Sequence, residues 1–203
     1  MLFCALSAAK GMVITMNEKQ AALISHLTYL DKPQGVKTLG EFSQYYIDNS
    51  EKLPSEDREG LMNTLESIKN DEYLRNLKIS GYENDNGKSG FVGYAFSDNS
   101  GQGVVAFRGT EPGTLEDWVP ENVSSAVLLE TPQLKKAKEF MQNQAGDLSS
   151  IQLAGHSLGG RLAGQVALLD DRATDAYTFN APGVSDAFFD ATEGADKILR
   201  NNF

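Results

Sequence analysis

The sequence predicts one α/β domain, in which helices flank a mostly parallel sheet and a helical segment precedes it. Residues 17–77 carry apolar side chains at helical spacing. Residues 78–108 then show short strands separated by turn residues, and from residue 131 helices alternate with strands. That alternation is typical of a parallel sheet covered on both faces. The composition, 40% hydrophobic and 23% charged over 203 residues, is that of a globular protein.

The helical segment contains three predicted helices. Asn17 can cap the first, which we expect over residues 17–29. Thr38 and Glu41 have the spacing of a capping box and open the second, over residues 38–49. Ser55 follows a proline and begins the third, with apolar residues at helical spacing through Ile68.

Strands are predicted over residues 78–82, 91–96 and 104–108, joined by the turn sequences 84–87 and 98–101. Links this short favour antiparallel neighbours. Thr131 and Pro132 open a helix to about residue 143, and a second helix covers residues 158–169. Further strands are expected over residues 151–154, 176–180 and 197–203.

The chain ends constrain the domain boundaries. We expect residues 1–16 to form an extension outside the fold and residues 17–203 to form the single domain. The apolar start, interrupted by Lys10, is too short to cross a membrane and lacks the basic beginning of a signal peptide. We therefore expect no transmembrane segment, and a chain that is cytoplasmic or exported without a signal peptide.

Charge and composition exclude some partners. The net charge of −10 repels phosphate backbones, so a nucleic-acid partner is not expected. One cysteine, Cys4, and two histidines provide no cluster with zinc-ligand spacing. We expect neither a metal nor another cofactor.

The strongest chemical signal is the sequence GHSLGG at residues 155–160, placed between a predicted strand and a predicted helix. In that context a G-x-S-x-G motif forms a sharp turn that lifts its serine, here Ser157, above the sheet. Gly155 and Gly159 allow strand and helix to approach closely, and the N–H of Leu158 can stabilise an oxyanion. The alternatives are a glycine-rich turn without a nucleophile, or a phosphate-binding loop, which usually carries a lysine that is missing here.

A second signal is FRGT at residues 107–110, which ends the strand expected beside the motif. A loop in this place supplies the second oxyanion donor, for which Thr110 is the candidate. Taken alone, the tetrapeptide also fits an ordinary strand end.

FRGT followed by GHSLGG resembles the class 3 (fungal-type) lipases, and residues 178–183 resemble the segment that follows the next strand in that family. The Asp117-Trp118 pair and the helix over residues 17–31 resemble an uncharacterised bacterial branch of the superfamily. The resemblance spans residues 17–203 and implies an α/β-hydrolase that cleaves carboxylic esters of lipids. It implies Ser157 as nucleophile, with Thr110 and Leu158 forming the oxyanion hole. Trp118 and residues 123–129 would lie near the acyl pocket or under a lid, or would be ordinary core. Arg108 is expected to be structural.

The proton acceptor is missing from the expected place. In this fold an acid and then a histidine follow the serine, but no histidine follows Ser157. His156 is adjacent to Ser157 and its side chain should diverge, while His26 is expected to be an ordinary helix histidine. The resemblance places the catalytic aspartate just beyond residue 203, so we expect a C-terminally truncated domain that lacks its last strands and helices. Asp186 is a candidate substitute acid.

Three functions remain open at this point. The first is a serine hydrolase of lipid esters, of lipase, phospholipase or esterase type. The second is a lipid- or acyl-binding module that kept the fold and lost catalysis. The third is an acyltransferase or thioesterase that uses the same serine.

Overall fold

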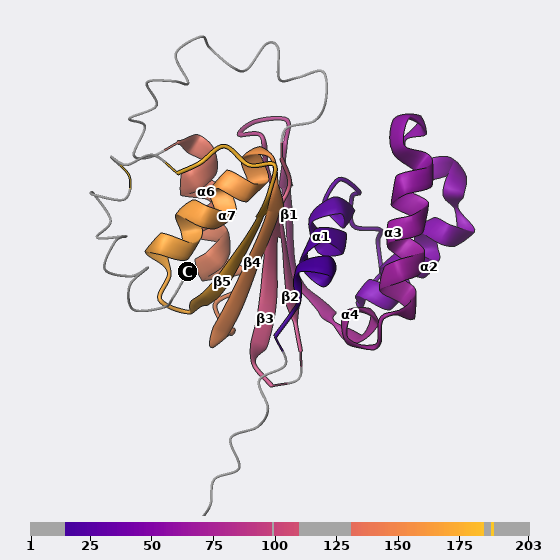
Figure 1. Ribbon diagram of the computed structural model, residues 1–203, viewed down its shortest axis with the longest axis horizontal. Coiled ribbons are helices and arrows are strands. Elements are labelled where there is room, and N and C mark those ends of the chain that lie inside the picture. The colour runs from indigo at the N-terminus through magenta and orange to yellow at the C-terminus, as the bar shows by residue number, and fades with distance from the viewer. Residues whose placement is uncertain (1–14, 99, 110–130, 185–187, 189–203) are drawn as a thin grey trace, which may run out of the picture.

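The computed structural model describes residues 15–98, 100–109, 131–184 and 188. Five strands form one open sheet with helices on both faces (Figure 1). In spatial order the strands are β1 (Lys78–Asp85), β2 (Phe91–Ser97), β3 (Gln102–Phe107), β4 (Ser150–His156) and β5 (Ala173–Phe179). The predicted α/β class is confirmed.

The sheet is mixed, which corrects the expectation of a mostly parallel one. β1, β2 and β3 form an antiparallel meander, whereas β3, β4 and β5 run parallel. The cause is the length of the links, since a short turn can join only antiparallel neighbours and a parallel pair needs a crossover. Helix α6 (Pro132–Asn143) lies in the crossover between β3 and β4, and α7 (Leu158–Leu169) joins β4 to β5.

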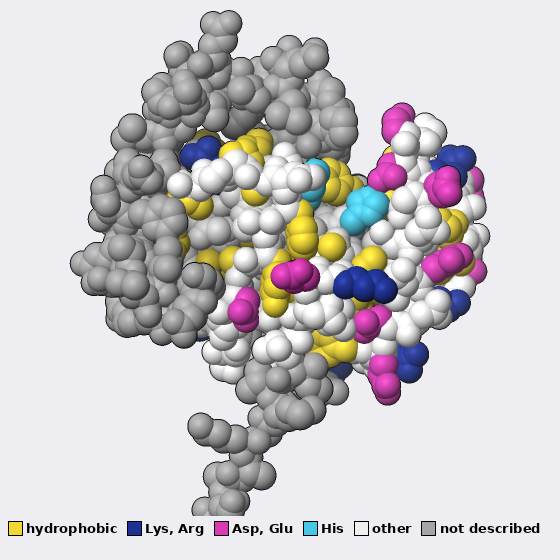
Figure 2. All heavy atoms as spheres, viewed as in Figure 1, with side chains coloured by type: hydrophobic (Ala, Val, Ile, Leu, Met, Phe, Trp, Pro, Cys, Tyr) yellow, Lys and Arg dark blue, Asp and Glu magenta, His cyan; other side chains and the backbone are white. Residues whose placement is uncertain are grey.

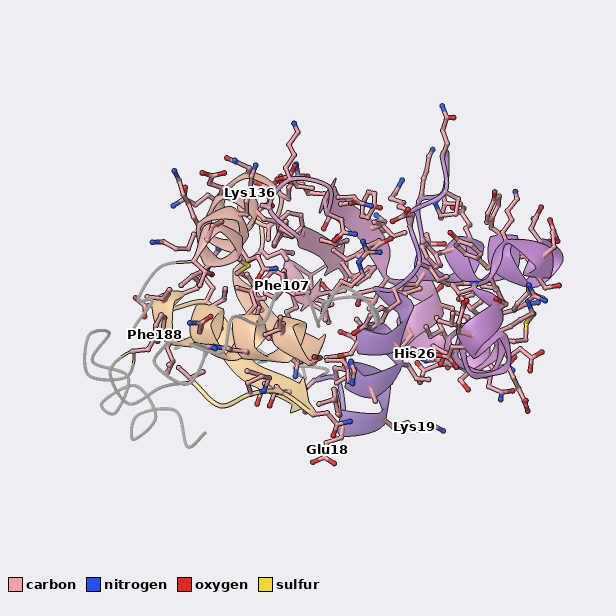
Figure 3. All side chains as sticks on the ribbon, turned by 90° about the horizontal axis from the view of Figure 1, so that it is seen from above. Glu18, Lys19, His26, Phe107, Lys136 and Phe188 are labelled. Carbon is pink, nitrogen blue, oxygen red and sulfur yellow. The ribbon has the colours of Figure 1, made fainter. Side chains whose placement is uncertain are left out.

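The two helical layers differ. α6 and α7 cover one face of the sheet. On the other face α1 (Glu18–Leu27) lies directly on the sheet, and α2 (Leu39–Asp48), α3 (Arg58–Asn70) and α4 (Glu72–Asn76) pack outside it. Figure 3, viewed from above, shows His26 between α1 and these outer helices, and Lys136 on the opposite side of the sheet.

Strand alternation builds a separate core on each face. On β2, Tyr94 and Phe96 point toward α1, while Phe91 and Ala95 point toward α6 and α7. β3 divides its side chains in the same way. Both faces of the central strands are therefore buried, which explains their nearly continuous apolar sequences.

Local capping signals are confirmed in detail. The Asn17 side chain accepts a hydrogen bond from the Gln20 N–H at 2.9 Å, and the Gln20 side chain accepts one from the Asn17 N–H at 3.0 Å. Thr38 and Glu41 form the second capping box. The third helix differs from the prediction, because a 3₁₀ turn, η2 (Ser55–Asp57), precedes α3. α4 was not predicted, since its single turn is too short to show a periodic pattern.

The predicted N-terminal boundary needs a correction at Met16. This residue is 1% exposed and belongs to the core beneath α1. Its N–H donates to Oε1 of buried Gln152 on β4 at 2.6 Å, and its carbonyl accepts from the Tyr177 hydroxyl at 2.7 Å. Met16 is therefore part of the fold rather than of an extension.

Several predicted features lie outside the described residues. They are Thr110, Trp118, residues 123–129, Asp186 and the strand expected over residues 197–203. In the part of the chain that the structure describes, no helix is both long enough and apolar enough to cross a bilayer.

Candidate active site

The site begins at the turn from β4 to α7. Ser157 has φ 56° and ψ −129°, a left-handed conformation that L-residues rarely adopt. Its N–H donates to the Phe179 carbonyl at the end of β5, at 2.9 Å, and its carbonyl accepts from the Gly160 N–H at 3.0 Å. These bonds hold the strained residue in place. Ser157 therefore lies at a sharp turn from strand β4 to helix α7.

Glycines allow this turn to form. A Cβ on Gly155 would overlap the Gly159 carbonyl and lie 2.7 Å from the Gly160 nitrogen. A Cβ on Gly159 would overlap the Phe107 carbonyl of β3. The obstructing atoms belong to the backbone, so no side chain could move aside for a substituent. The predicted close approach of strand and helix is therefore present.

The N-terminus of helix α7 presents a backbone N–H beside Ser157 that can donate a hydrogen bond to a negatively charged group. Leu158 is its first residue, and the first N–H groups of a helix have no partner within the helix. The helix dipole adds partial positive charge at the same end. The Ser157 side chain makes no capping hydrogen bond to α7. The predicted second donor, Thr110, lies outside the described residues.

The residues that follow β3 lie beside the turn that carries Ser157. A Cβ on Gly109 would lie 2.6 Å from the His156 carbonyl and 3.1 Å from the Ser157 Cβ. Arg108 is buried, its N–H donates to the Val92 carbonyl at 3.0 Å, and its guanidinium lies 3.7 Å from Asp31 Oδ1. Gly109, the third residue of the FRGT sequence, therefore lies beside the turn, and the contacts of Arg108 join β2 and the segment around Asp31 to the end of β3.

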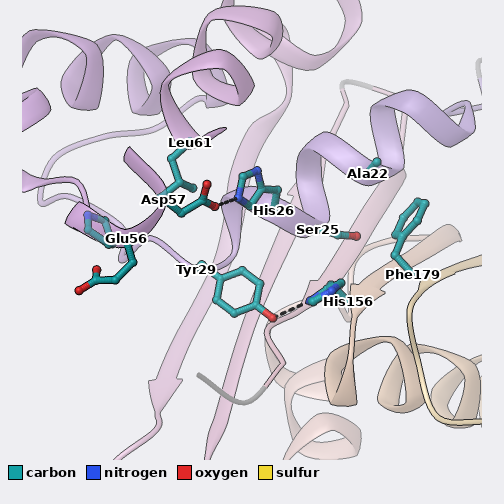
Figure 4. A pocket seen from close by; sticks show the side chains of 10 residues that line it. Ala22, Ser25, His26, Tyr29, Glu56, Asp57, Leu61, His156 and Phe179 are labelled. Carbon is teal, nitrogen blue, oxygen red and sulfur yellow. Dashed lines mark hydrogen bonds and ion pairs between the residues drawn. The ribbon is translucent and has the colours of Figure 1, made fainter. Parts of the chain in front are cut away.

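A cleft of about 850 Å³ opens next to the turn. One wall comes from α1, the opposite wall from η2 and the start of α3, and the inner end from β4 and β5. Figure 4 shows these side chains, and Figure 2 shows both histidines, in cyan, on the face where the cleft lies. The residues that line it are Ala22, Ser25, His26, Tyr29, Pro54, Glu56, Asp57, Leu61, His156 and Phe179.

Both histidines of the chain line this cleft, and both bond to residues other than Ser157. His26 Nδ1 lies 2.8 Å from the Thr64 hydroxyl, and its Nε2 lies 2.6 Å from Asp57 Oδ2. His156 Nδ1 lies 2.8 Å from the Tyr29 hydroxyl. His26 is thus more than a helix residue: it joins α1 to η2 and α3 across the cleft wall. No sequence pattern indicated this, because its partners are distant along the chain.

Tyrosine hydroxyls surround Asp31, which follows the cleft-lining Tyr29 by two residues. The Tyr82 hydroxyl donates to Asp31 Oδ1 at 2.9 Å, and the Tyr46 hydroxyl donates to the Asp31 carbonyl at 2.8 Å. Burial, with the nearby Asp31 carboxylate adding to it, raises the pKa of Tyr46 to about 12. Burial likewise raises the pKa of Tyr94. These hydroxyls therefore stay protonated and act as donors at neutral pH.

No group of three or more histidine, cysteine, aspartate or glutamate side chains within the described ranges could hold a metal ion.

Ser25, on the cleft wall, is 2% exposed, and its hydroxyl has no hydrogen-bond partner.

Comparison with known proteins gives two matches. Residues 20–200 match the family described as phospholipase-like, the Tle-like phospholipase domain. An extracellular phospholipase A1 from Serratia liquefaciens is 40% identical over 99 residues, which are 48% of this chain and 29% of that protein. No solved structure matches the chain. Because the family match covers nearly the whole sequence, the chain belongs to the Tle-like phospholipase domain family.

Proposed function

We propose that this chain carries the site of a serine hydrolase that cleaves a carboxylic ester of a phospholipid, and that Ser157 is its nucleophile. The observation that carries the proposal is the conformation of Ser157, φ 56° and ψ −129°, at a strand-to-helix junction lined by glycines. Backbone strain of this kind persists mainly at functional sites, where the surrounding structure maintains it. The family match and the phospholipase A1 relative support a lipid substrate.

In the proposed reaction the Ser157 Oγ attacks the ester carbonyl and forms a tetrahedral intermediate. The N–H of Leu158 stabilises the oxyanion, with Thr110 as the second donor. The intermediate collapses to an acyl-serine ester and expels the alcohol, here the lysophospholipid, whose oxygen takes up the proton lost by Ser157. Water then hydrolyses the acyl-serine, which releases the fatty acid and restores the serine hydroxyl. α/β-hydrolase-like architecture of the class 3 lipase type is part of the proposal, and Trp118 is assigned to substrate binding.

The proton of Ser157 needs an acceptor, and the two histidine rings are engaged by Thr64, Asp57 and Tyr29. This observation favours a second candidate function, a lipid-binding module that retains the fold without turnover. The chain spans 29% of the length of the Serratia relative, so the activity of that protein is carried over here only as a proposal. Asp186 remains the proposed substitute acid.

One experiment separates the two candidates. Hydrolysis of a short p-nitrophenyl ester, and fatty-acid release from phosphatidylethanolamine vesicles, are measured for the 203-residue chain and for Ser157→Ala. Ser150→Ala, at the far end of β4, is the matched control. We expect Ser157→Ala to remove turnover, by up to about 10⁶-fold as for the nucleophile of subtilisin, and Ser150→Ala to retain it.

The outcomes differ for each function. Vesicle binding without serine-dependent turnover identifies the binding module. Turnover that survives Ser157→Ala excludes Ser157 as nucleophile. A chain that neither binds vesicles nor hydrolyses either ester contradicts both proposals.

A further inference from the structure

Three consecutive residues after α1 each contact a different strand of the sheet or the residue that follows it. Tyr29 bonds through its hydroxyl to His156 of β4, at 2.8 Å. The Leu30 carbonyl accepts from the Tyr94 hydroxyl of β2 at 2.7 Å, and the Asp31 carboxylate pairs with Arg108 after β3, at 3.7 Å. This segment is therefore held against the sheet edge on which the nucleophile turn lies.

Within the segment, the Tyr29 hydroxyl lies beside the proposed nucleophile. A Cβ added to Gly109 would lie 2.8 Å from the Tyr29 hydroxyl oxygen and 3.1 Å from the Ser157 Cβ. The Tyr29 hydroxyl and the Ser157 side chain thus both lie close to Gly109. Tyr29 also lines the cleft, and its ring meets the His156 ring edge-on, with centroids 5.9 Å apart (Figure 4).

We propose that Tyr29 is a positioning residue for the nucleophile turn. The Tyr29 hydroxyl and His156 Nδ1 lie 2.8 Å apart. In the proposed arrangement the O–H is the donor, so the neutral imidazole carries its proton on Nε2 and the ring that directly precedes Ser157 is fixed. The hydroxyl and the Ser157 Cβ both lie close to Gly109, so a fixed Tyr29 hydroxyl limits the space open to the Ser157 side chain. This inference rests on the proposed hydrolase function, and it assigns an active-site role to the N-terminal helical segment.

The kinetic test is Tyr29→Phe, which removes one oxygen atom and retains the ring. We expect kcat to fall about threefold to tenfold, the effect of one lost hydrogen bond, with KM unchanged. Tyr45→Phe is the matched control, because it removes an exposed tyrosine hydroxyl from the same helical segment. A purely structural role would lower the unfolding midpoint and leave kcat of the folded protein unchanged, which would overturn the proposal.

A second readout does not depend on turnover. The chain has two histidines, so ¹⁵N spectra of the rings, assigned with His156→Gln, report the tautomer of each. We expect His156 in the wild-type chain to carry its proton on Nε2, and Tyr29→Phe to shift both this signal and the backbone amides of Ser157 and Leu158. Tyr45→Phe should leave them unchanged.

The two readouts distinguish the failure of each proposal. Unchanged His156, Ser157 and Leu158 signals in Tyr29→Phe overturn the positioning role, whatever the activity. Absence of serine-dependent turnover in the wild-type chain counts against the hydrolase function, and the expected effect of Tyr29 on kcat fails with it. In that case the ring and amide signals still establish whether Tyr29 orders the turn. Equal turnover of Tyr29→Phe and wild type, with Ser157→Ala inactive, overturns the positioning role alone.

Discussion

The strain at Ser157 can be measured without any assay of activity. The residue holds φ 56° and ψ −129°, a conformation that costs an L-residue on the order of 1–3 kcal/mol. Glycine has no Cβ and adopts positive φ freely, so Ser157→Gly releases this strain. Ser157→Ala removes the hydroxyl and keeps the strain. The comparison of these two variants therefore isolates the backbone contribution.

The expected magnitude follows from two opposing effects. Glycine in regular structure costs about 0.5–1 kcal/mol relative to alanine, because the unfolded chain gains freedom. Ser150 begins the same strand in ordinary strand conformation, so Ser150→Gly should be less stable than Ser150→Ala by that amount. At Ser157 the released strain offsets this cost, and we expect the glycine variant to be more stable than the alanine variant by about 1 kcal/mol.

Urea unfolding of the four variants, monitored by circular dichroism, measures these differences. The quantity of interest is the glycine-minus-alanine difference at Ser157, compared with the same difference at Ser150. We expect the two to be separated by about 1–3 kcal/mol. A separation below about 0.5 kcal/mol would show that the turn stores no strain, and the argument from backbone conformation to nucleophile would be lost.

Two further predictions concern packing and pH. Gly159→Ala should lower the free energy of unfolding by about 1–3 kcal/mol, because the new Cβ would meet the Phe107 carbonyl. Gly183→Ala, with no atom within 4 Å of the new Cβ, should change it by less than about 0.5 kcal/mol in the same urea titration. Tyr46 has a folded-state pKa of about 12, above the value near 10 of an unfolded tyrosine. The contribution of the protonated Tyr46 hydroxyl to the free energy of unfolding is therefore complete below pH 10 and declines between pH 10 and 12. Urea titrations across this range should show a shallower decline for Tyr46→Phe, and an equal decline in both proteins would contradict the assignment.

Local structure followed closely from local residues. Capping side chains at Asn17 and Thr38, and the proline at position 132, placed the helix starts correctly because a cap interacts with backbone only a few residues away. Turn residues between the first strands correctly indicated antiparallel neighbours. The prediction of a mostly parallel sheet was wrong, because two such short links make two of the four described strand pairings antiparallel.

The arrangement of the site divides in the same way. The serine turn is local: strand, glycines, serine and helix are adjacent in sequence, so GHSLGG was sufficient to predict its form. The cleft wall is not local. Tyr29 meets His156, and His26 meets Asp57, only after α1 has packed on the sheet and η2 has packed on α1.

The amino-acid sequence alone therefore determined the class of fold, the caps and the form of the turn, since each depends on neighbouring residues. Which side chains surround Ser157 was decided by the tertiary structure. The reason is physical: a side chain far away in the sequence reaches the serine only because burial of the apolar faces of α1, β2 and β3 brings their ends together. Even Met16, which the sequence suggested lay outside the domain, is held in the core by a bond to Gln152 of β4.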